Sequence, residues 1–434
     1  MVASGKSKID MKGKTIATDN RVFFCVFFTK LKLYPMSEFT QHKATRVAKL
    51  VELFQLVIRG EMTSELVPDY QQVIDLTSPA DVIAVVDQLV QLPVPMPELK
   101  KGINKALNLL NKALQEYPYQ PPASGSFLHV LIRNNEQLDL RLKTIRPLLK
   151  QLNQDQDNRS VRKELIGKFT DLSRLGLHYQ IKENIFFPLV EKYLPDYHCL
   201  QVMWSFHDDI RRNLKEVIHL LDSENFDRQR FNRLAGDLFF NIYAIRFREE
   251  RILFPIVTEI IPETELNALT TESLEIGFPF VQPEAYSGEK VHPDSAFSGE
   301  VDLKTGHVTA EQIRLIFNHL PVDITYVDEN NKVKFFSTPE KRIFRRTNSI
   351  IGRDIRNCHP HESVHVVEQI VEAFRNGTKD KASFWIQMKG EFILIQYFAI
   401  RDEQGNYKGV AEVSQEITEI RNIQGEKRLL DWTL

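Results

Sequence analysis

Apolar positions first fall into a regular pattern near residue 40, where they follow one face of a helix. They recur at i, i+3, i+4 and i+7 and comprise Val47, Leu50, Val51, Phe54 and Val57. The sequence Ser-Pro-Ala-Asp at 78–81 then supplies an N-cap, a proline at the first helical position and an acid in the first turn. A third apolar face ends at Leu114. These patterns predict a small all-α domain over 40–117, with a proline-rich linker after it.

Residues 126–262 keep the helical period and contain an internal repeat. The sequence Lys-Glu-Asn-Ile-Phe-Phe-Pro-Leu-Val at 182–190 is echoed by Glu-Glu-Arg-Ile-Leu-Phe-Pro-Ile-Val at 249–257. A looser echo in the helices that precede these segments aligns His129 with His207. Two helix pairs of one design predict a four-helix bundle with pseudo-twofold symmetry.

The pattern changes again in the last third of the chain. Residues 263–307 lose periodicity and contain several prolines, which predicts a linker and a domain boundary. Alternating runs at 323–327 and 333–336 then flank an Asp/Glu/Asn/Asn turn, a helical pattern follows at 364–374, and further strand patterns cover 382–388, 392–400 and 409–413. This order predicts an α+β domain over 308–425, with helices on one side of an antiparallel sheet, and a tail at 426–434.

The first 35 residues differ from the rest in charge. They carry seven Lys or Arg and two Asp, which is +5, whereas the whole chain is −2. Their apolar run at 22–28 is far shorter than the about 20 residues that span a bilayer. A targeting or membrane-surface segment and an ordered strand are alternatives, but we favour a disordered leader, with Met36 as the real start. No other apolar run approaches membrane length, which predicts a soluble, cytoplasmic protein without a membrane partner.

Composition narrows the possible chemistry. Because 56 Lys and Arg balance 58 Asp and Glu, nothing in the chain as a whole attracts a phosphate backbone, and we expect no nucleic-acid partner. The three cysteines, Cys25, Cys199 and Cys358, are too few for a disulfide framework. No Cys-x-x-Cys pair exists, which excludes a thiolate zinc site and directs attention to the histidines.

Three histidines fall on different predicted helices of the bundle, and carboxylates lie near two of the corresponding positions. Imidazole and carboxylate groups that project inward are the usual ligands of non-haem iron or manganese in helical bundles. The candidate metal ligands are His129, His178, Glu183, His207, Glu249 and Glu250. The alternative is structural, because a single helical histidine is most often an ordinary core or surface residue, and the Phe-Pro repeat can be a helix-end packing device.

The segments at 177–188 and 202–210 resemble the hemerythrin-like (His-His-Glu cation-binding) family, over about 126–262. The resemblance implies that His129, His178, Glu183, His207 and one of Glu249 or Glu250 hold iron. The family places a carboxylate four residues after the histidine, but this chain has Lys182 there and its acid one residue later. Glu183 would then lie about 140° from His178 around an α-helix, unless the helix has a π-bulge. Ser126 and Ile245 also replace histidines, so we expect a mononuclear or asymmetric site.

The segment at 320–337, together with Ile-Gly-Arg at 351–353 and the sequence at 412–418, resembles the start and end of a PAS sensor domain, over about 308–425. The core of such a domain is a pocket, which holds haem, flavin or another small ligand, or is empty. Haem would need a histidine or cysteine as axial ligand, and the candidates are Cys358, His359 and His361. We favour a structural role for them, because Pro360 before a new helix is an ordinary helix start.

The order of helical domain, bundle and PAS domain resembles a family of bacterial cytoplasmic proteins with these three parts. With no catalytic motif in view, we expect an iron-binding sensory or regulatory protein that responds to oxygen, nitric oxide or redox state, with an unknown signalling partner and a homodimer through the PAS domain. One alternative is an iron-dependent enzyme or repair protein that handles nitric oxide or peroxide damage. The other is a haem-binding PAS scaffold with a structural bundle.

Overall fold

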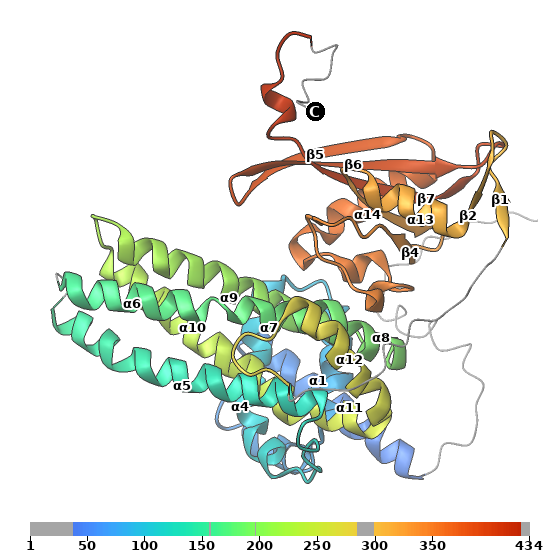
Figure 1. Ribbon diagram of the computed structural model, residues 1–434. Helices are drawn as coiled ribbons and strands as arrows, with labels where there is room; N and C mark the ends of the chain where they lie inside the picture. Colours follow the sequence, from blue (N-terminus) through green and yellow to red (C-terminus); the bar gives the residue numbers. More distant parts are fainter. Residues whose placement is uncertain (1–37, 156–157, 196, 284–298, 427–434) are drawn as a thin grey trace, which may run out of the picture. The chain divides into compact units, whose positions relative to one another are not determined.

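The computed structural model describes residues 38–155, 158–195, 197–283 and 299–426 (Figure 1). The predicted leader and most of the C-terminal tail lie outside these residues. The first described part is all helical, and its helices are α1 (Glu38–Arg59), α2 (Val67–Asp75), α3 (Pro79–Val90) and α4 (Met96–Glu116). The predicted N-cap is present at the start of α3 and forms a capping box, in which the Ser78 backbone N–H donates to the Asp81 carboxylate at 2.9 Å.

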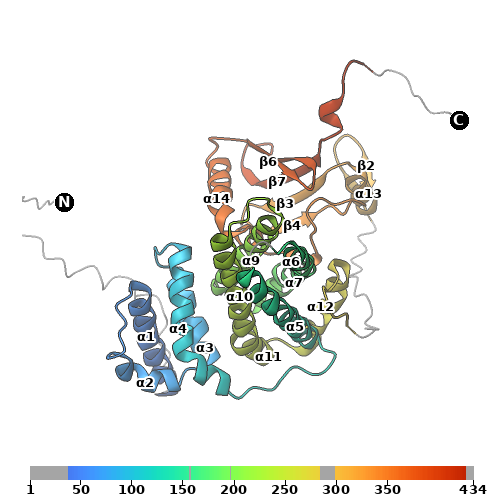
Figure 2. The same cartoon turned by 90° about the vertical axis from the view of Figure 1, so that its left-hand side faces the viewer.

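The middle part is a four-helix bundle whose second and fourth helices are interrupted (Figures 1 and 2). Its elements are α5 (Phe127–Gln154), α6 (Arg159–Leu172), α7 (Leu175–Ile181), the π-helix η1 (Lys182–Phe186), α8 (Phe187–Tyr193), α9 (Cys199–Asp222), α10 (Arg228–Arg248), the π-helix η2 (Glu249–Leu253) and α11 (Phe254–Ile260). The prediction of a four-helix bundle is confirmed.

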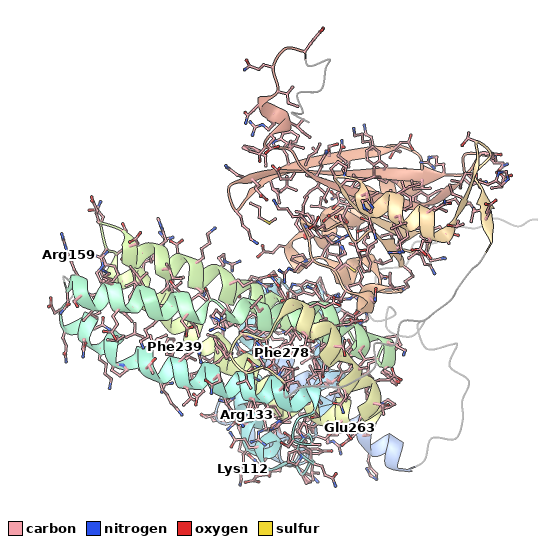
Figure 3. All side chains as sticks on the ribbon, viewed as in Figure 1. Lys112, Arg133, Arg159, Phe239, Glu263 and Phe278 are labelled. Atoms are coloured by element: carbon pink, nitrogen blue, oxygen red, sulfur yellow. The ribbon has the colours of Figure 1, made fainter. Side chains whose placement is uncertain are left out.

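Residues predicted to start the linker instead form a further helix, α12 (Glu263–Ile276). Its first residue and Phe278, just beyond its end, are marked in Figure 3. Pro262 is the residue before the helix and does not break it, and Leu266, Leu269 and Ile276 are buried. The linker prediction is therefore wrong for 263–276, because a short amphipathic helix with a proline before its first turn resembles a proline-rich connector in sequence.

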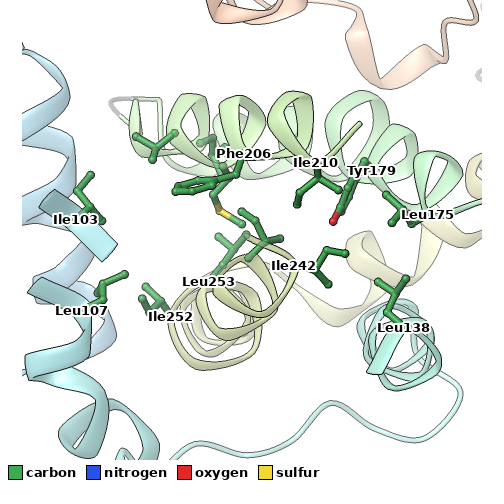
Figure 4. Close-up of a cluster of buried hydrophobic side chains, with 14 of the residues drawn as sticks. Ile103, Leu107, Leu138, Leu175, Tyr179, Phe206, Ile210, Ile242, Ile252 and Leu253 are labelled. Atoms are coloured by element: carbon green, nitrogen blue, oxygen red, sulfur yellow. The ribbon is translucent and has the colours of Figure 1, made fainter. Parts of the chain in front are cut away.

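One buried apolar cluster includes side chains of α3, α4 and the bundle. In Figure 4, Ile103 and Leu107 of α4 lie beside Ile252 and Leu253 of η2, and Tyr179 projects among residues of the bundle helices. The polar groups described below therefore lie in an apolar interior, where an unpaired charge is costly. In the described part of the chain, no helix combines the length and apolar character needed to cross a membrane.

The C-terminal part is the predicted α+β domain. Its elements are β1 (Glu300–Asp302), β2 (His307–Thr309), α13 (Ala310–His319), β3 (Asp323–Asp328), β4 (Val333–Phe336), the 3-10 helices η3 (Asn348–Ile350) and η4 (Ile355–Cys358), α14 (His361–Arg375), β5 (Lys381–Met388), β6 (Glu391–Arg401), β7 (Tyr407–Glu416) and η5 (Ile420–Asn422). Five strands form an antiparallel sheet in the order β4-β3-β7-β6-β5, whereas β1 and β2 form a separate hairpin.

Two local features fix the centre of the sheet. The backbone N–H groups of Asn330 and Lys332 donate to Asp328 Oδ1 at 2.9 and 2.8 Å, which holds the predicted turn between β3 and β4. At the same end of β3, a Cβ added to Gly409 would collide with the Val327 carbonyl, so only glycine allows β7 this close. Side chains of α14, including Val367 and Phe374, pack with Val327 and Val410 of the sheet.

Candidate metal centre

The bundle interrupts two of its helices with π-turns at equivalent places in the repeat. These turns are η1 and η2, and their first residues, Lys182 and Glu249, are 67 positions apart. Each π-turn inserts one extra residue, and Pro188 or Pro255 follows it at the start of the next helix. The π-bulge on which the position of Glu183 depends is therefore present. It brings the Glu183 carboxylate to 2.9 Å from His207 Nδ1.

The two equivalent residues at the starts of the π-turns face each other. Lys182 Nζ lies 2.7 Å from each carboxylate oxygen of Glu249. Both side chains are only 1 % exposed, so this is a fully buried ion pair. Burial lowers the pKa of Lys182, while the negative charge of Glu249 opposes that shift.

Both imidazoles of the centre have a defined tautomer. Asn135 Nδ2 donates to Glu249 Oε2 at 3.0 Å, so Asn135 Oδ1 faces His178 Nε2 at 2.8 Å as an acceptor. His178 therefore carries its proton on Nε2 and its lone pair on Nδ1. His207 donates from Nδ1 to Glu183, which leaves its lone pair on Nε2. Both side chains are completely buried, and among the residues that the structure describes neither His178 Nδ1 nor His207 Nε2 has a hydrogen-bond partner.

Electrostatics keep these imidazoles neutral. Burial, followed by the charge of Lys182, lowers the pKa of both His178 and His207 well below its usual range. The Tyr179 ring stacks on His207 with 3.9 Å between ring centroids and an angle of 8°. A neutral imidazole with a buried, unshared lone pair is the form that binds a metal ion.

The carboxylates, in contrast, already have cationic partners. Arg211 donates to both oxygens of Glu183, at 3.1 and 2.9 Å. Burial raises the pKa of Glu183 to about 7, and Arg211 opposes this shift. Glu250 accepts from Arg246 at 2.9 Å and from Asn135 at 3.2 Å. Two imidazoles, three carboxylates and several cations thus share the interior of the bundle.

Residues 127–257 match the model of the hemerythrin HHE cation binding domain, and residues 313–418 match that of a PAS domain. The chain belongs to the proteins that combine these two domains. No protein with a curated description matches the chain.

Among solved structures, a C-terminal domain from Streptococcus mutans is 32 % identical over 29 % of this chain and 96 % of its own, with a TM-score of 0.28. The PAS domain of a Colwellia psychrerythraea protein is 18 % identical over 25 % of this chain and 97 % of its own, with a TM-score of 0.20. A sensory box sensor histidine kinase from Vibrio cholerae is 13 % identical over 25 % and 90 %, also with a TM-score of 0.20.

In the hemerythrin domain, the structure brings together five of the six candidate ligands and leaves His129 apart. His129 lies in the first turn of α5, is only partly buried, and accepts from the Gly125 N–H through Nδ1 at 3.1 Å. Asn135, about 9 Å further along the helix, contacts Glu250 as His207 contacts Glu183. The predicted alignment of His129 with His207 is therefore wrong by six residues.

Sequence reasoning missed the polar residues that organise the centre. Asn135, Arg211 and Arg246 were not candidates because amides and guanidinium groups are not metal ligands. Lys182 was noted only as a departure from the family motif. A signal was available for Asn135, since an asparagine inside an otherwise apolar helix face implies a buried hydrogen-bonding role.

The donors of this centre are only partly available to a cation. Within the described residues, no three His, Cys, Asp or Glu side chains come together as a complete metal site. The two imidazole lone pairs are nevertheless buried without partners, and Glu183 supports His207 from behind as carboxylates support metal-bound histidines. Glu249, another candidate ligand, is bound to the Lys182 ammonium.

Of the PAS candidates for haem binding, Cys358 has ordinary structural contacts. The Cys358 thiol donates to the Asp354 carbonyl at 3.5 Å inside η4 and packs against the core of the domain. Burial raises the pKa of the Cys358 thiol and lowers the pKa of His359. His361 is the first residue of α14, where Pro360 starts the helix as expected. In the described part of the domain, these contacts give no support for haem.

Proposed function

We propose that the hemerythrin domain binds one iron ion through His178 and His207, and that the protein responds to oxygen, nitric oxide or redox state. A hemerythrin HHE domain joined to a PAS domain supports a metal-binding sensory protein in general. The observation that carries the iron site is the pair of buried imidazole lone pairs without partners. Iron held by few protein ligands supplies open coordination positions and a redox couple.

The chain's own residues prepare this site. Asn135 fixes the tautomer of His178, and Glu183 fixes that of His207, so each ring presents its lone pair without a proton to lose. Tyr179 stacks against His207 and, with the surrounding apolar side chains, excludes water. Lys182 and Arg211 neutralise the carboxylates, which keeps the interior from accumulating negative charge when the cation is absent.

A route to the PAS domain supports the sensory role. Because the Phe187 N–H bonds to the Lys182 carbonyl and Pro188 has no N–H, the carbonyls of Glu183 and Asn184 lack helical donors. Two PAS side chains supply donors. Arg353 Nη1 donates to the Glu183 carbonyl at 2.8 Å, and Thr347 Oγ1 donates to the Asn184 carbonyl at 3.1 Å. A displacement of Glu183 would therefore move the hydrogen-bond acceptor of Arg353 and act directly on the PAS loop that carries this arginine.

Iron content tests the proposal. Protein expressed in iron-replete medium and purified without a metal-binding tag is expected to hold about one iron per chain by mass spectrometry of metals. His178→Ala and His207→Ala should each abolish binding, because each removes one of two nitrogen donors. His129→Ala, which changes a histidine outside the centre, should keep the wild-type content. Folded wild-type protein without iron, or iron content unaffected by both centre variants, contradicts the proposal.

The response of the bound iron to nitric oxide can be measured on the same sample. Nitric oxide added to the reduced protein is expected to produce a new electron paramagnetic resonance signal, because an open position on iron accepts it. The His207→Ala protein serves as the control without the signal. An iron-loaded protein whose spectra are unchanged by nitric oxide, oxygen and reductant would not be a sensor of these agents.

Asn135→Ala should lower iron affinity about 10–100-fold, the usual cost of losing a residue that orients a metal-bound histidine. The amide both holds His178 Nε2 and donates to Glu249 and Glu250, so its loss frees the ring and leaves two carboxylates short of a donor. Asn111→Ala on the exposed face of α4 is the matched control. Competition with a chelator measures both affinities, and equal values for the two variants would contradict the role given to Asn135.

A further inference from the structure

The ion pair between Lys182 and Glu249 has an unusual position in the bundle. These two residues occupy equivalent places in the internal repeat, as the first residues of η1 and η2. Equivalent residues of two related halves can touch only where the pseudo-twofold axis passes between them. The 2.7 Å contact between Lys182 Nζ and the Glu249 carboxylate therefore lies on that axis, at the middle of the centre.

A pair of acids at these two positions would be the symmetric arrangement. In helical bundles, carboxylates from related helices that face each other across the middle of the core share two metal ions. In this chain the second half keeps its acid, Glu249, and the first half has a lysine. The ammonium group contacts both oxygens of Glu249 and lies 5.5 Å from the centre of the Tyr179 ring. It thus takes the place that a cation would have between the two halves.

We infer that Lys182 is a built-in substitute for a second metal ion and limits the hemerythrin domain to one. The ammonium neutralises Glu249 and repels any further cation at the axis, because like charges in an apolar interior are strongly unfavourable. This inference rests on the proposed function for the first ion, but the substitution by Lys182 can be tested without it.

The test counts metal ions in Lys182→Glu, which places two carboxylates at the axis and removes the ammonium. Full-length wild-type and variant proteins are equilibrated with Mn²⁺ or Fe²⁺ under anaerobic conditions, and bound metal is counted after gel filtration. The expected result is one additional ion in the variant relative to wild type. Lys182→Arg keeps the charge and should not gain an ion, and neither should Lys163→Glu, which adds an acid on the exposed side of α6.

The outcomes separate this inference from the proposed function. If wild type binds no metal and Lys182→Glu binds one ion, the proposed function fails and the role of Lys182 stands. If folded Lys182→Glu binds the same number as wild type, the inference is overturned. Should Lys182→Glu fail to fold, Lys182→Gln removes the charge, keeps a polar side chain that is one atom shorter, and frees Glu249 from the ion pair. Its melting temperature should then rise with added Mn²⁺ beyond the rise seen for wild type, and an equal rise overturns the inference.

Discussion

Glu249→Ala is expected to lower the free energy of unfolding by about 3–5 kcal/mol, the usual cost of removing one partner of a buried ion pair. The Lys182 side chain is only 1 % exposed, so the variant leaves its ammonium in an apolar core without the carboxylate whose two oxygens it contacts. It also deprives the Asn135 amide of its acceptor on this side, at 3.0 Å in the native protein. Urea unfolding followed by circular dichroism measures the change.

Removing both charges tests the physical reason. A double variant, Lys182→Met with Glu249→Leu, should recover most of the lost stability, because replacing a buried pair by apolar groups of similar volume is often neutral or stabilising. Glu136→Ala removes one partner of an exposed pair with Arg133 and should cost at most about 1 kcal/mol. A loss for Glu249→Ala no larger than that of Glu136→Ala would show that Lys182 does not depend on Glu249.

The architecture was predictable because it depends on repeated patterns. The 67-residue repeat around the Phe-Pro pairs is reproduced as two π-turns, and the strand alternation beyond 320 is reproduced as the antiparallel sheet. Period and turn chemistry are local properties, so a single sequence contains them. The helix at 263–276 escaped prediction because only its burial against the bundle distinguishes it from a polar connector.

The candidate metal centre was only partly predictable because it depends on contacts between pairs of side chains from different helices. His178, Glu183 and His207 were identifiable by type and position, but which atom of each faces which partner depends on side chains from other helices. The π-turn that brings Glu183 to His207 is a property of the backbone that Pro188 indicates only indirectly. Nothing in the sequence alone reveals that Lys182 meets its repeat equivalent, because contact across a symmetry axis is a property of the assembled bundle.

Arg353→Ala is expected to stop changes in the hemerythrin domain from affecting the PAS domain. The Arg353 side chain is 3 % exposed and donates to the Glu183 carbonyl. It also forms a bidentate ion pair with Glu191, with hydrogen bonds of 2.9 and 2.8 Å. Its loss leaves a buried carbonyl without a donor and a carboxylate without a partner. We expect a cost of about 1–3 kcal/mol per group left unpaired, felt as local opening of the π-turn η1.

Hydrogen exchange followed by mass spectrometry resolves this effect by segment. In wild type, loading with iron should slow exchange both at 182–193 and at the PAS segment 345–358. In Arg353→Ala, exchange at 182–193 should be faster throughout, and iron should no longer change the PAS segment. Arg356→Ala is the matched control, because Arg356 lies three residues away, is exposed, and pairs only with Asp354 of its own domain among the described residues.

Arg353→Lys distinguishes the effect of several hydrogen bonds from one guanidinium from the effect of its positive charge alone. Arg353→Lys keeps the charge opposite Glu191 but cannot reach Glu191 and the Glu183 carbonyl at once, since an ammonium lacks the planar fork of a guanidinium. It should therefore retain part of the protection at 182–193 and lose the iron-dependent change in the PAS segment. If Arg353→Ala still transmits the effect of iron to 345–358, communication between the domains does not pass through the π-turn, and Arg353 serves only to hold the loop in place.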